Sequence, residues 1–404
     1  MDKKNNYVIT KKDGIICYGY FNNGIPCELY CEPEEQESIV GNIYVARVER
    51  IAEGIGGAFL EIGKGEECYL PFKKICPIKL SPGPKDKICG GDLLLVQITK
   101  DAVKKKLPVA DGNVSLNGKY FVFTLTDKRS GISKKIKEET ERNRLLNIAK
   151  PYKTADYGIV VRTNAKEVSE ECLTNELEHL RKRYEKLMKK AAISPGKTLL
   201  YKESPHYISL IKELPSGELS EIITDQEVIY ERVKEYISDY NNGDEGCAMR
   251  LYQDDYSLFH LYRFAHFYEQ AYEKTVWLKS GGSLVIEHTE AMTVIDVNTG
   301  SVIKKKKQSE NLFYQINCEA AEEIARQIRL RNLSGIILID FINMKEENLQ
   351  KKLMSRLDQE CRKDRIRCTV IDMTALNLVE MTRNKVRRPL YEQIRLCRTK
   401  NRQG

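Results

Sequence analysis

The chain has 404 residues, which is too many for one small core, so we expect two to four domains. Hydrophobic residues make up 41% and charged residues 31% of the sequence, as is typical of a soluble, folded protein. No run of about 18 apolar residues occurs and the first residues are polar, so the sequence predicts neither a membrane span nor a secretory signal. The formal net charge of +8 fits a basic face for an acidic partner, but also a solvated surface of mixed charge.

The twelve cysteines are scattered along the chain, and no two of them form a Cys-x-x-Cys pair. This distribution predicts reduced thiols in a cytoplasmic protein, most of them small core residues. No zinc site built from thiols is evident in the sequence.

Short strands dominate the first part of the chain. Residues 7–38 predict several of them, and residues 41–98 contain alternating and glycine-rich segments that predict a small β-barrel. Phe59 and Tyr69 would lie on adjacent strands of this barrel. Exposed aromatic side chains there would stack on unpaired bases, whereas buried ones would belong to the core, and both interpretations fit the sequence.

Basic residues recur after the predicted barrel. A lysine-rich loop covers residues 104–112, and a turn at residues 130–136 carries two more lysines. A buried strand, residues 158–163, then ends on Arg162 and Thr163. The arginine fork matches phosphate oxygens, so this strand end is a candidate phosphate site, with a routine salt bridge as the alternative.

Helical periodicity marks two long segments. Residues 165–192 and 309–331 place apolar side chains three or four apart, which predicts amphipathic helices. Between them, residues 205–275 mix strand and helix, and we expect helices at residues 226–236 and 261–274. Together with its strands, the later helix gives the last third of the chain an α/β pattern.

The stretch TVIDVNTG, residues 293–300, is an apolar strand that carries Asp296 and Asn298 two residues apart, on one face. A second apolar strand, GIILIDF at residues 335–341, carries Asp340 near its end. Carboxylates at the ends of two buried strands can hold Mg²⁺, which prefers oxygen ligands and lowers the pKa of a bound water. The alternative is that these acids only cap neighbouring helices.

Basic residues flank both acids. Four lysines occupy residues 304–307, and Arg326, Arg329 and Arg331 precede the second acid. Carboxylates for a metal beside cations for phosphates are what a nuclease needs. The lysine run is equally typical of a solvated face.

Two long stretches give the sequence a family resemblance. LKSGGSLVIEHTEAMTVIDVNTG at residues 278–300 and NCEAAEEIARQIRLRNLSGIILIDFINM at residues 317–344 resemble the catalytic domain of the ribonuclease E/G family, and LVEMTR at residues 378–383 fits it too. The match extends, more weakly, from about residue 40 to residue 390. It implies a cytoplasmic hydrolase, a Mg²⁺-dependent endoribonuclease of rRNA and mRNA processing and decay, with Mn²⁺ as an alternative metal. The enzyme would cut single-stranded RNA to 5′-phosphate and 3′-hydroxyl ends and be stimulated by a 5′-monophosphate.

The resemblance also implies an α+β, multidomain fold. A ribonuclease-H-like (RNase-H-like) subdomain would hold an inserted S1 domain, an OB-type β-barrel, and a 5′-sensor region, and a DNase-I-like α/β subdomain would carry catalysis. The implied boundaries are residues 1–38 and 205–275 for the RNase-H-like subdomain, 39–115 for the S1 domain, 116–204 for the sensor, 276–393 for the catalytic subdomain and 394–404 for a tail without a folded module.

Site residues carry over from the family by their positions in these motifs. They are the metal ligands Asp296 and Asp340 with their catalytic partner Asn298, the RNA-holding residues Phe59, Tyr69, Lys106 and Lys134, and the 5′-phosphate sensor made of Gly118, Val122, Arg162, Thr163 and Arg367. Tyr69 stands where the family more usually has phenylalanine, and Lys134 where better-known members have arginine. Both replacements keep the aromatic or cationic character that the role requires.

Two departures from the family pattern concern charge and assembly. Asn343 stands where the family often has aspartate, and because Asp340 is retained we expect only a change in local charge. The Cys-Pro-x-Cys zinc link that usually follows the catalytic domain is missing, and only Cys397 stands near its place. We therefore expect no zinc-bridged dimer, which leaves a homodimer formed by other contacts or a monomer.

Two other function classes remain open on sequence grounds. A non-catalytic RNA-binding or ribosome-associated protein would keep the S1 barrel but not the nuclease, and retention of Asp296, Asn298 and Asp340 argues against it. A DNA-directed nuclease is disfavoured because the barrel aromatics and the family both indicate RNA.

Overall fold

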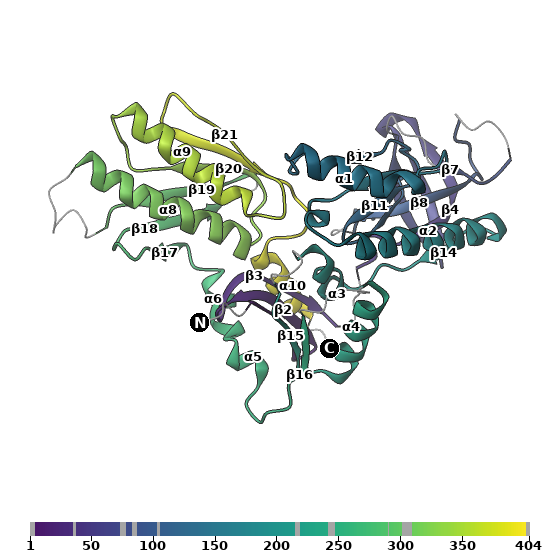
Figure 1. Ribbon diagram of the computed structural model, residues 1–404, viewed down its shortest axis with the longest axis horizontal. Helices are drawn as coiled ribbons and strands as arrows, with labels where there is room; N and C mark the ends of the chain where they lie inside the picture. Colours follow the sequence, from purple (N-terminus) through teal and green to yellow (C-terminus); the bar gives the residue numbers. More distant parts are fainter. Residues whose placement is uncertain are drawn as a thin grey trace. The chain divides into compact units, whose positions relative to one another are not determined.

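The computed structural model describes residues 5–34, 38–72, 78–82, 87–102, 106–214, 219–240, 247–289, 291–300 and 309–400. The chain divides into two compact units, each with its own hydrophobic cores. The first unit comprises Met1–Gln36, Leu219–Glu231 and Cys247–Gly404, and the second comprises Glu37–Glu218 and Arg232–Gly246. The fold is mixed α+β with several sheets, as expected (Figure 1).

A five-stranded sheet of the first unit joins segments that are distant in sequence. Its order is β16-β15-β1-β2-β3, in which β1, β2 and β3 are antiparallel and β15 and β16 run parallel to β1. The strands are β1 Asn5–Lys12, β2 Ile15–Asn22, β3 Ile25–Pro33, β15 Glu221–Thr224 and β16 Ala248–Leu251. Asp-Gly at 13–14 and Asn-Gly at 23–24 have positive φ, as tight hairpin turns require, so they fix the β1-β2-β3 meander.

Three short helices pack on this sheet: α5 Leu258–Leu261, α6 Phe264–Gln270 and α10 Leu390–Lys400. The predicted helix at 261–274 is wrong in its bounds, because Arg263 adopts a left-handed φ of 53° and separates α5 from α6. Residues 394–400, expected to be part of a tail without a folded module, are helical. They belong to α10, whose Leu390, Ile394 and Cys397 are buried in the core of the sheet.

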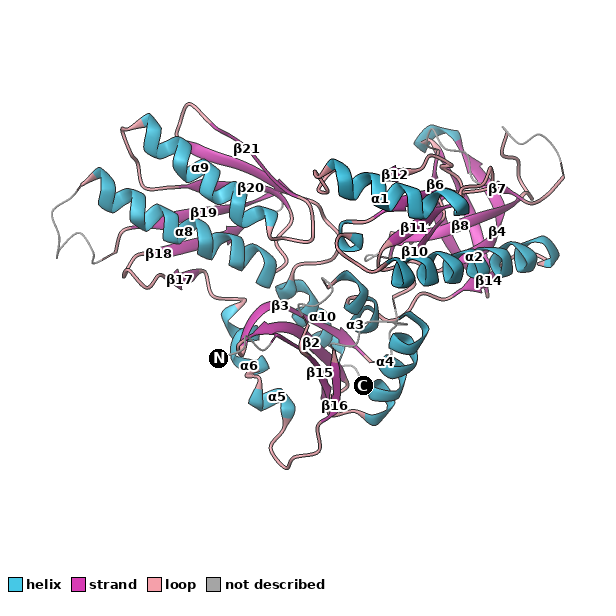
Figure 2. Ribbon diagram, viewed as in Figure 1, coloured by secondary structure: helices cyan, strands magenta, loops and turns pink. Residues whose placement is uncertain are grey.

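A six-stranded sheet, also in the first unit, carries both predicted acids. Its order is β17-β18-β19-β20-β22-β21, and only β19 and β20 pair in parallel. Its strands are β17 Thr275–Trp277, β18 Ser283–His288, β19 Met292–Asn298, β20 Gly335–Asp340, β21 Cys368–Met373 and β22 Leu378–Arg383. Helices α8 Glu310–Leu330 and α9 Glu347–Arg362 lie side by side over one face and form its core with the strands (Figure 2). The opposite face is the one that the acids share.

The second unit contains a closed five-stranded barrel, consistent with an OB or S1 domain. Its strands follow each other in the order β4-β5-β6-β9-β8, and β8 pairs with β4 to close it. They are β4 Ile43–Ala52, β5 Gly57–Gly63, β6 Glu66–Pro71, β8 Leu93–Lys100 and β9 Val109–Asp111. Two outer strands, β7 Ile78–Lys79 and β14 Thr198–Tyr201, extend the sheet.

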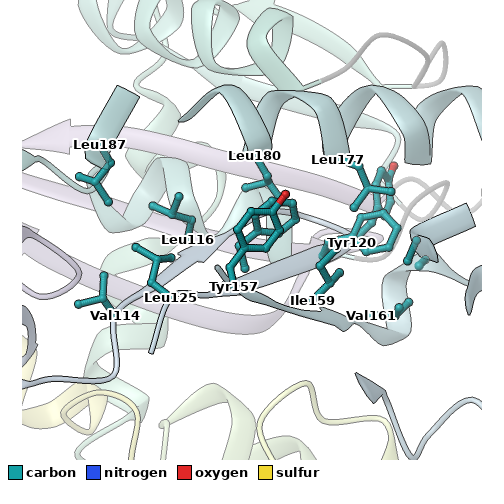
Figure 3. Packing of buried hydrophobic residues seen from close by; sticks show 14 of the residues in the cluster. Val114, Leu116, Tyr120, Leu125, Tyr157, Ile159, Val161, Leu177, Leu180 and Leu187 are labelled. Carbon is teal, nitrogen blue, oxygen red and sulfur yellow. The ribbon is translucent and has the colours of Figure 1, made fainter. Parts of the chain in front are cut away.

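A four-stranded sheet completes the second unit, in the order β10-β11-β13-β12. It consists of β10 Ser115–Asn117, β11 Phe121–Thr124, β12 Gly131–Ile132 and β13 Gly158–Val161. The long helix α2, Glu170–Ile193, begins after Ser169, whose side chain accepts a hydrogen bond from the Cys172 backbone N–H. Figure 3 shows Leu177, Leu180 and Leu187 of this helix directed onto the sheet. The predicted helix at 165–192 is therefore confirmed, with a later start.

The remaining helices of the described residues are short or join other elements. They are α1 Glu139–Ala149, α3 His206–Ser209, α4 Glu227–Tyr240 and the single-turn 3-10 helices η1 Glu53–Ile55, η2 Lys150–Tyr152, η3 Thr163–Ala165 and η4 Ile211–Glu213. In the parts of the chain described above, no helix has the length and apolar content needed to cross a bilayer.

Candidate functional site

The two predicted acids lie next to each other near the C-terminal ends of two central strands of the six-stranded sheet. Asp296 of β19 and Asp340 of β20 are partners in the parallel register, so their side chains share a face. Asp296 is half-buried and Asp340 is exposed. The Asn298 side-chain amide donates to Asp296 Oδ2 at 2.7 Å, which fixes the carboxylate and directs the amide to the same place. The structure therefore brings together all three residues of the predicted catalytic group.

This donor set fits a hard, partly hydrated cation. Among the described residues, no group of three or more Asp, Glu, His or Cys side chains could enclose a metal. Two carboxylates on an open face suit Mg²⁺, which keeps several waters and is commonly held by one or two carboxylates plus substrate phosphate. The residues present therefore fit this metal better than a structural zinc site.

The turn after β20 is held by a buried amide that sequence reasoning missed. Asn317 of α8 is fully buried and forms two hydrogen bonds with Ile342. Its Nδ2 donates to the Ile342 carbonyl at 2.8 Å, and its Oδ1 accepts from the Ile342 N–H at 3.0 Å. Because Ile342 follows Asp340 by two residues, this pair of bonds fixes the direction in which the acid-bearing strand ends. The only sequence signal was an amide among the apolar positions of a helix.

Glycine is required where the chain turns away from Asn298. A Cβ on Gly300, whose φ is +56°, would lie 2.2 Å from the Gly281 carbonyl oxygen. A Cβ on Gly282 would lie 2.8 Å from the Asn298 carbonyl oxygen. The turn before β18 and the turn after β19 therefore approach each other beside the acids, which explains the glycines of both motifs.

The departure at Asn343 has a local partner. Asn343 is exposed, and its Oδ1 accepts a hydrogen bond from Asn377 Nδ2 at 3.2 Å. An aspartate could accept the same bond, so the amide keeps this contact while it removes a negative charge.

The basic residues of α8 do not form the predicted set of phosphate ligands. Arg331 is 3% exposed, donates to Gln327 and to the Glu273 carbonyl, and burial lowers its pKa to about 10. It is a structural residue, so that part of the prediction is wrong. Arg326 pairs with Glu323, and Arg329 donates to the Glu360 carbonyl at 3.3 Å. The lysine run at 304–307 lies outside the described residues.

The two barrel aromatics are on the outside of the barrel. Phe59 of β5 and Tyr69 of β6 are direct cross-strand partners, with ring centroids 5.7 Å apart, and both are half-buried. Their strand neighbours Ala58, Leu60, Cys68 and Leu70 are the ones that fill the barrel. The interpretation that Phe59 and Tyr69 are core residues is therefore wrong, and the two rings form one outward surface.

Polar groups hold this aromatic surface in place. The Arg50 guanidinium lies over the Phe59 ring, with Cζ 3.9 Å from the centroid. The Tyr69 hydroxyl donates to the Ile55 carbonyl at 2.7 Å, and its backbone N–H donates to the Pro108 carbonyl at 2.9 Å. Lys106 is exposed and precedes Pro108 by two residues, so the chain places this lysine near Tyr69.

A second candidate group of the second unit surrounds Arg162. Arg162 Nη1 donates to the Gly118 carbonyl at 2.7 Å, and the Thr163 hydroxyl lies 2.8 Å from that of Ser133. Lys134 follows Ser133 and is exposed, and Val122 pairs with Val160 on the adjacent strands. The structure thus brings Gly118 and Arg162 into contact, with Thr163, Val122 and Lys134 on neighbouring elements.

Glu176 of α2 organises this group and was not predicted. Its carboxylate is 4% exposed and accepts hydrogen bonds from three successive backbone N–H groups, those of Lys119, Tyr120 and Phe121, each at 2.8 Å. Burial raises the pKa of Glu176, although these bonds and the nearby Arg162 oppose the rise. A Cβ on Gly118 would lie 2.3 Å from Glu176 Oε1, so glycine is required there.

The fifth predicted sensor residue belongs to the other unit. Arg367 is exposed and precedes β21 of the six-stranded sheet. Its membership of the Arg162 group stays a prediction, because the structure describes each unit by itself.

The cysteine nearest the missing zinc link is internal. Cys397 of α10 is 2% exposed, and its sulfur lies 3.9 Å from that of Cys31 on β3. Contact with Cys397 and burial raise the pKa of the Cys31 thiol. Cys397 is therefore part of the core of the five-stranded sheet.

Comparisons with known proteins agree with this arrangement. A model described as "Ribonuclease E/G family" matches residues 115–386. The chain is similar to Ribonuclease G of Escherichia coli K12, with 33% identity over 379 residues that cover 91% of this chain and 77% of that protein. It is 30% identical to Ribonuclease G of Haemophilus influenzae over 378 residues, with the same coverages, and 32% identical to Ribonuclease E of a Nostoc species over 377 residues, which cover 90% of this chain and 55% of that protein.

Proposed function

The chain belongs to the ribonuclease E/G family and is an endoribonuclease, and we propose that it hydrolyses single-stranded RNA with Mg²⁺ held between Asp296 and Asp340. The observation that carries this proposal is the register of β19 and β20, which places the two carboxylates side by side on an open face. The products would be a 5′-phosphate and a 3′-hydroxyl end. Mn²⁺ would meet the same oxygen ligands.

The residues of the site have separate tasks in this mechanism. When bound, the metal would polarise the scissile phosphodiester and lower the pKa of a coordinated water. Asp296 and Asp340 would hold it, each from the end of a different strand. The Asn298 amide fixes Asp296 through its Nδ2, and its carbonyl oxygen would accept a hydrogen bond from the attacking water, orienting it without adding charge.

We propose the domain layout that the resemblance implies. The β16-β15-β1-β2-β3 sheet supports an RNase-H-like subdomain, the closed barrel supports an S1 domain, and the sheet covered by α2 supports a sensor region. The six-stranded sheet with α8 and α9 would be the DNase-I-like part. Its boundary would move to before residue 390, because α10, Leu390–Lys400, packs in the core of the β16-β15-β1-β2-β3 sheet.

RNA would reach the acids from two binding surfaces. Phe59 and Tyr69 present adjacent rings on the outside of the barrel, where bases would stack, and Lys106 and Lys134 would neutralise phosphates. A 5′-monophosphate would bind at Arg162 and Thr163, with Gly118, Val122 and Arg367 completing the pocket. Among the described residues, the Arg162 guanidinium donates only through Nη1, to the Gly118 carbonyl. Its other two nitrogens are therefore left for phosphate oxygens. A role in rRNA and mRNA processing in the cytoplasm remains a prediction. So does a homodimer without a zinc bridge.

The metal assignment is tested by Asp296→Asn and Asp340→Asn, singly and together. We expect cleavage of a short single-stranded RNA to fall about a hundredfold or more, because a metal supplies several kcal/mol of transition-state stabilisation. Asp372→Asn, an exposed acid on β21 of the same sheet, is the matched control and should cleave normally. Cleavage that persists in the double variant would disprove the assignment.

The same assay tests the two other function classes. Wild type that binds RNA but does not cut it with Mg²⁺ or Mn²⁺ would favour the non-catalytic RNA-binding protein. Cleavage in a DNA substrate panel would favour the DNA-directed nuclease.

The sensor is tested by comparing RNAs that carry a 5′-monophosphate or a 5′-hydroxyl. We expect wild type to prefer the monophosphate and Arg162→Ala to lose that preference while it cleaves the hydroxyl RNA at the wild-type rate. Arg129→Ala provides the control, because Arg129 is an exposed arginine of the same unit paired with Asp127. Equal rates on both RNAs in wild type and Arg162→Ala would remove the sensor from the proposal.

A further inference from the structure

The only tryptophan of the chain is exposed on the sheet that carries the catalytic acids. Trp277 ends β17, the edge strand, and is 73% exposed. Its neighbours Val276 and Leu278 are the residues of this segment that pack into the core. Among the described residues, no ring or cation covers the Trp277 indole. A large apolar side chain is therefore held mostly in water, outside the core.

The strand register places Trp277 on the face of the acids. Trp277 pairs with Ser283, and Ser283 pairs with Asn298, so the three residues form one row across β17, β18 and β19. Residues in register point to the same side of a sheet. The next row on that side, two residues along each strand, contains Asp296 and Asp340. Since neighbouring strands are about 4.8 Å apart, the Trp277 and Asn298 backbones are about 10 Å apart. A nucleotide next to the scissile phosphate can span this distance.

The surroundings of Trp277 are polar, not apolar. Thr275 and Lys279 are exposed on either side of it along the chain. Lys274, the residue before β17, and Glu287 of β18 form an exposed ion pair at 2.7 Å. A protein–protein interface needs roughly 1,000 Å² of complementary surface with an apolar centre. One aromatic ring among charges instead suits a nucleotide of single-stranded RNA, whose base offers a flat face to stack on and whose phosphate can pair with a lysine.

We propose that Trp277 is a stacking platform for a base of single-stranded RNA next to the cleavage site. This inference rests on the proposed function, because the RNA must lie at the Asp296–Asp340 pair. It adds an RNA contact on the catalytic sheet itself. The stacked base would fix the register of the RNA relative to the acids, so the platform would affect where the strand is cut as well as how tightly it binds.

The single tryptophan makes the platform directly observable. Intrinsic tryptophan emission of the full chain reports Trp277 alone. We expect a short unstructured RNA, added with a chelator so that it is not cut, to change this emission and to protect it from quenching by acrylamide. We also expect Trp277→Ala to weaken binding of the same labelled RNA about 5- to 150-fold, the loss of one stacked base, and Trp277→Phe to weaken it less. Because the side chain is outside the core, both variants should fold like wild type.

A control variant and the contrary outcomes distinguish the Trp277 platform from the proposed endoribonuclease function on which it rests. Tyr256→Ala removes another exposed aromatic of the first unit, 61% exposed, and should bind RNA like wild type. RNA binding with unchanged Trp277 emission, together with wild-type affinity of Trp277→Ala, would overturn the platform and leave the proposed function standing. Emission that instead depends on protein concentration without RNA would identify a second copy as the occupant and also overturn it. Wild type that neither binds nor cuts RNA would overturn both.

Discussion

Glu176 shows how one side chain can set the shape of a binding group that it does not itself complete. Its carboxylate gathers the N–H groups of three consecutive residues, 119–121, which hold the backbone beside Gly118. The Gly118 carbonyl in turn receives Arg162 Nη1. The direction of the guanidinium proposed to read a 5′-phosphate therefore depends on a glutamate in the middle of α2.

Glu176→Gln should uncouple this arrangement while keeping the side-chain volume. The glutamine NH₂ cannot accept a hydrogen bond, so at least one of the three N–H groups loses its partner, which costs roughly 1–3 kcal/mol of unfolding free energy. We expect a lower urea midpoint and a reduced preference for 5′-monophosphate over 5′-hydroxyl RNA. Glu178→Gln, which removes a half-buried carboxylate paired with Arg181 on the same helix, is the control. A variant that loses stability but keeps the full preference would limit Glu176 to a structural role.

The raised pKa of Glu176 also predicts a pH dependence of stability. An unfolded glutamate has a pKa of about 4.3. Between that value and the higher pKa of the folded state, the folded protein binds this proton and the unfolded chain does not. The contribution of Glu176 to the free energy of unfolding is therefore largest below about pH 4.3 and falls as the pH rises through this window. Denaturant titrations of wild type and Glu176→Gln over this range should differ in slope, with the additional fall of stability in wild type, and parallel curves would contradict the shift.

Neither Glu176 nor Trp277 was predicted, and the reason is physical. A glutamate in a charged amphipathic helix resembles the solvated glutamates around it, and its partners lie more than fifty residues away. A tryptophan in an apolar motif resembles a core residue until the strand register is known. Asp296, Asn298 and Asp340 were predicted because a strand has a fixed period of two and because the family motif extends over both strands.

At the scale of elements, the α8–β20 connection is the most informative. Apolar positions four apart predicted a helix at 309–331, and α8 spans Glu310–Leu330. The strands with the acids were predicted from their apolar runs. What periodicity could not supply was the bidentate bond from Asn317 to Ile342, because it depends on how the helix lies over the sheet. The bounds of the predicted helix at 261–274 were wrong for a similar local reason, since nothing in the periodicity indicated the left-handed Arg263.

Asn317→Ala should therefore impair catalysis more than binding. It removes the hydrogen-bond partner of both the N–H and the C=O of the half-buried Ile342, at roughly 0.5–1.5 kcal/mol each, and frees the turn that fixes Asp340. We expect kcat to fall at least tenfold with little change in KM, because a small misplacement of a catalytic group lowers the rate steeply. Gln315→Ala, an exposed position of the same helix, should behave like wild type. An unchanged kcat in a folded Asn317→Ala protein would show that Asp340 is positioned without this clamp.

On the scale of the whole molecule, metal and fold should be separable. The cores of both units are apolar and the acid pair lies outside them, toward the C-terminal ends of β19 and β20, so folding is expected not to depend on a cation. We expect a chelator to abolish RNA cleavage without changing the thermal unfolding midpoint, and added Mg²⁺ to restore cleavage. A large fall in the midpoint would indicate a structural metal instead. The length of the chain predicted several domains, and the two compact units with four sheets agree with that expectation.

The order of synthesis gives the five-stranded sheet a further consequence. The meander of β1, β2 and β3 leaves the ribosome first, but its parallel partner β15 begins only at Glu221. At about 5–20 residues per second, the nascent meander waits about 10–40 s for that partner, and longer for α10, which covers β3 near Cys31. Throughout this time it presents an open strand edge and an uncovered apolar face, which is the kind of surface that chaperones bind. Translation speed across the intervening segment should therefore influence how much of this enzyme reaches its native state.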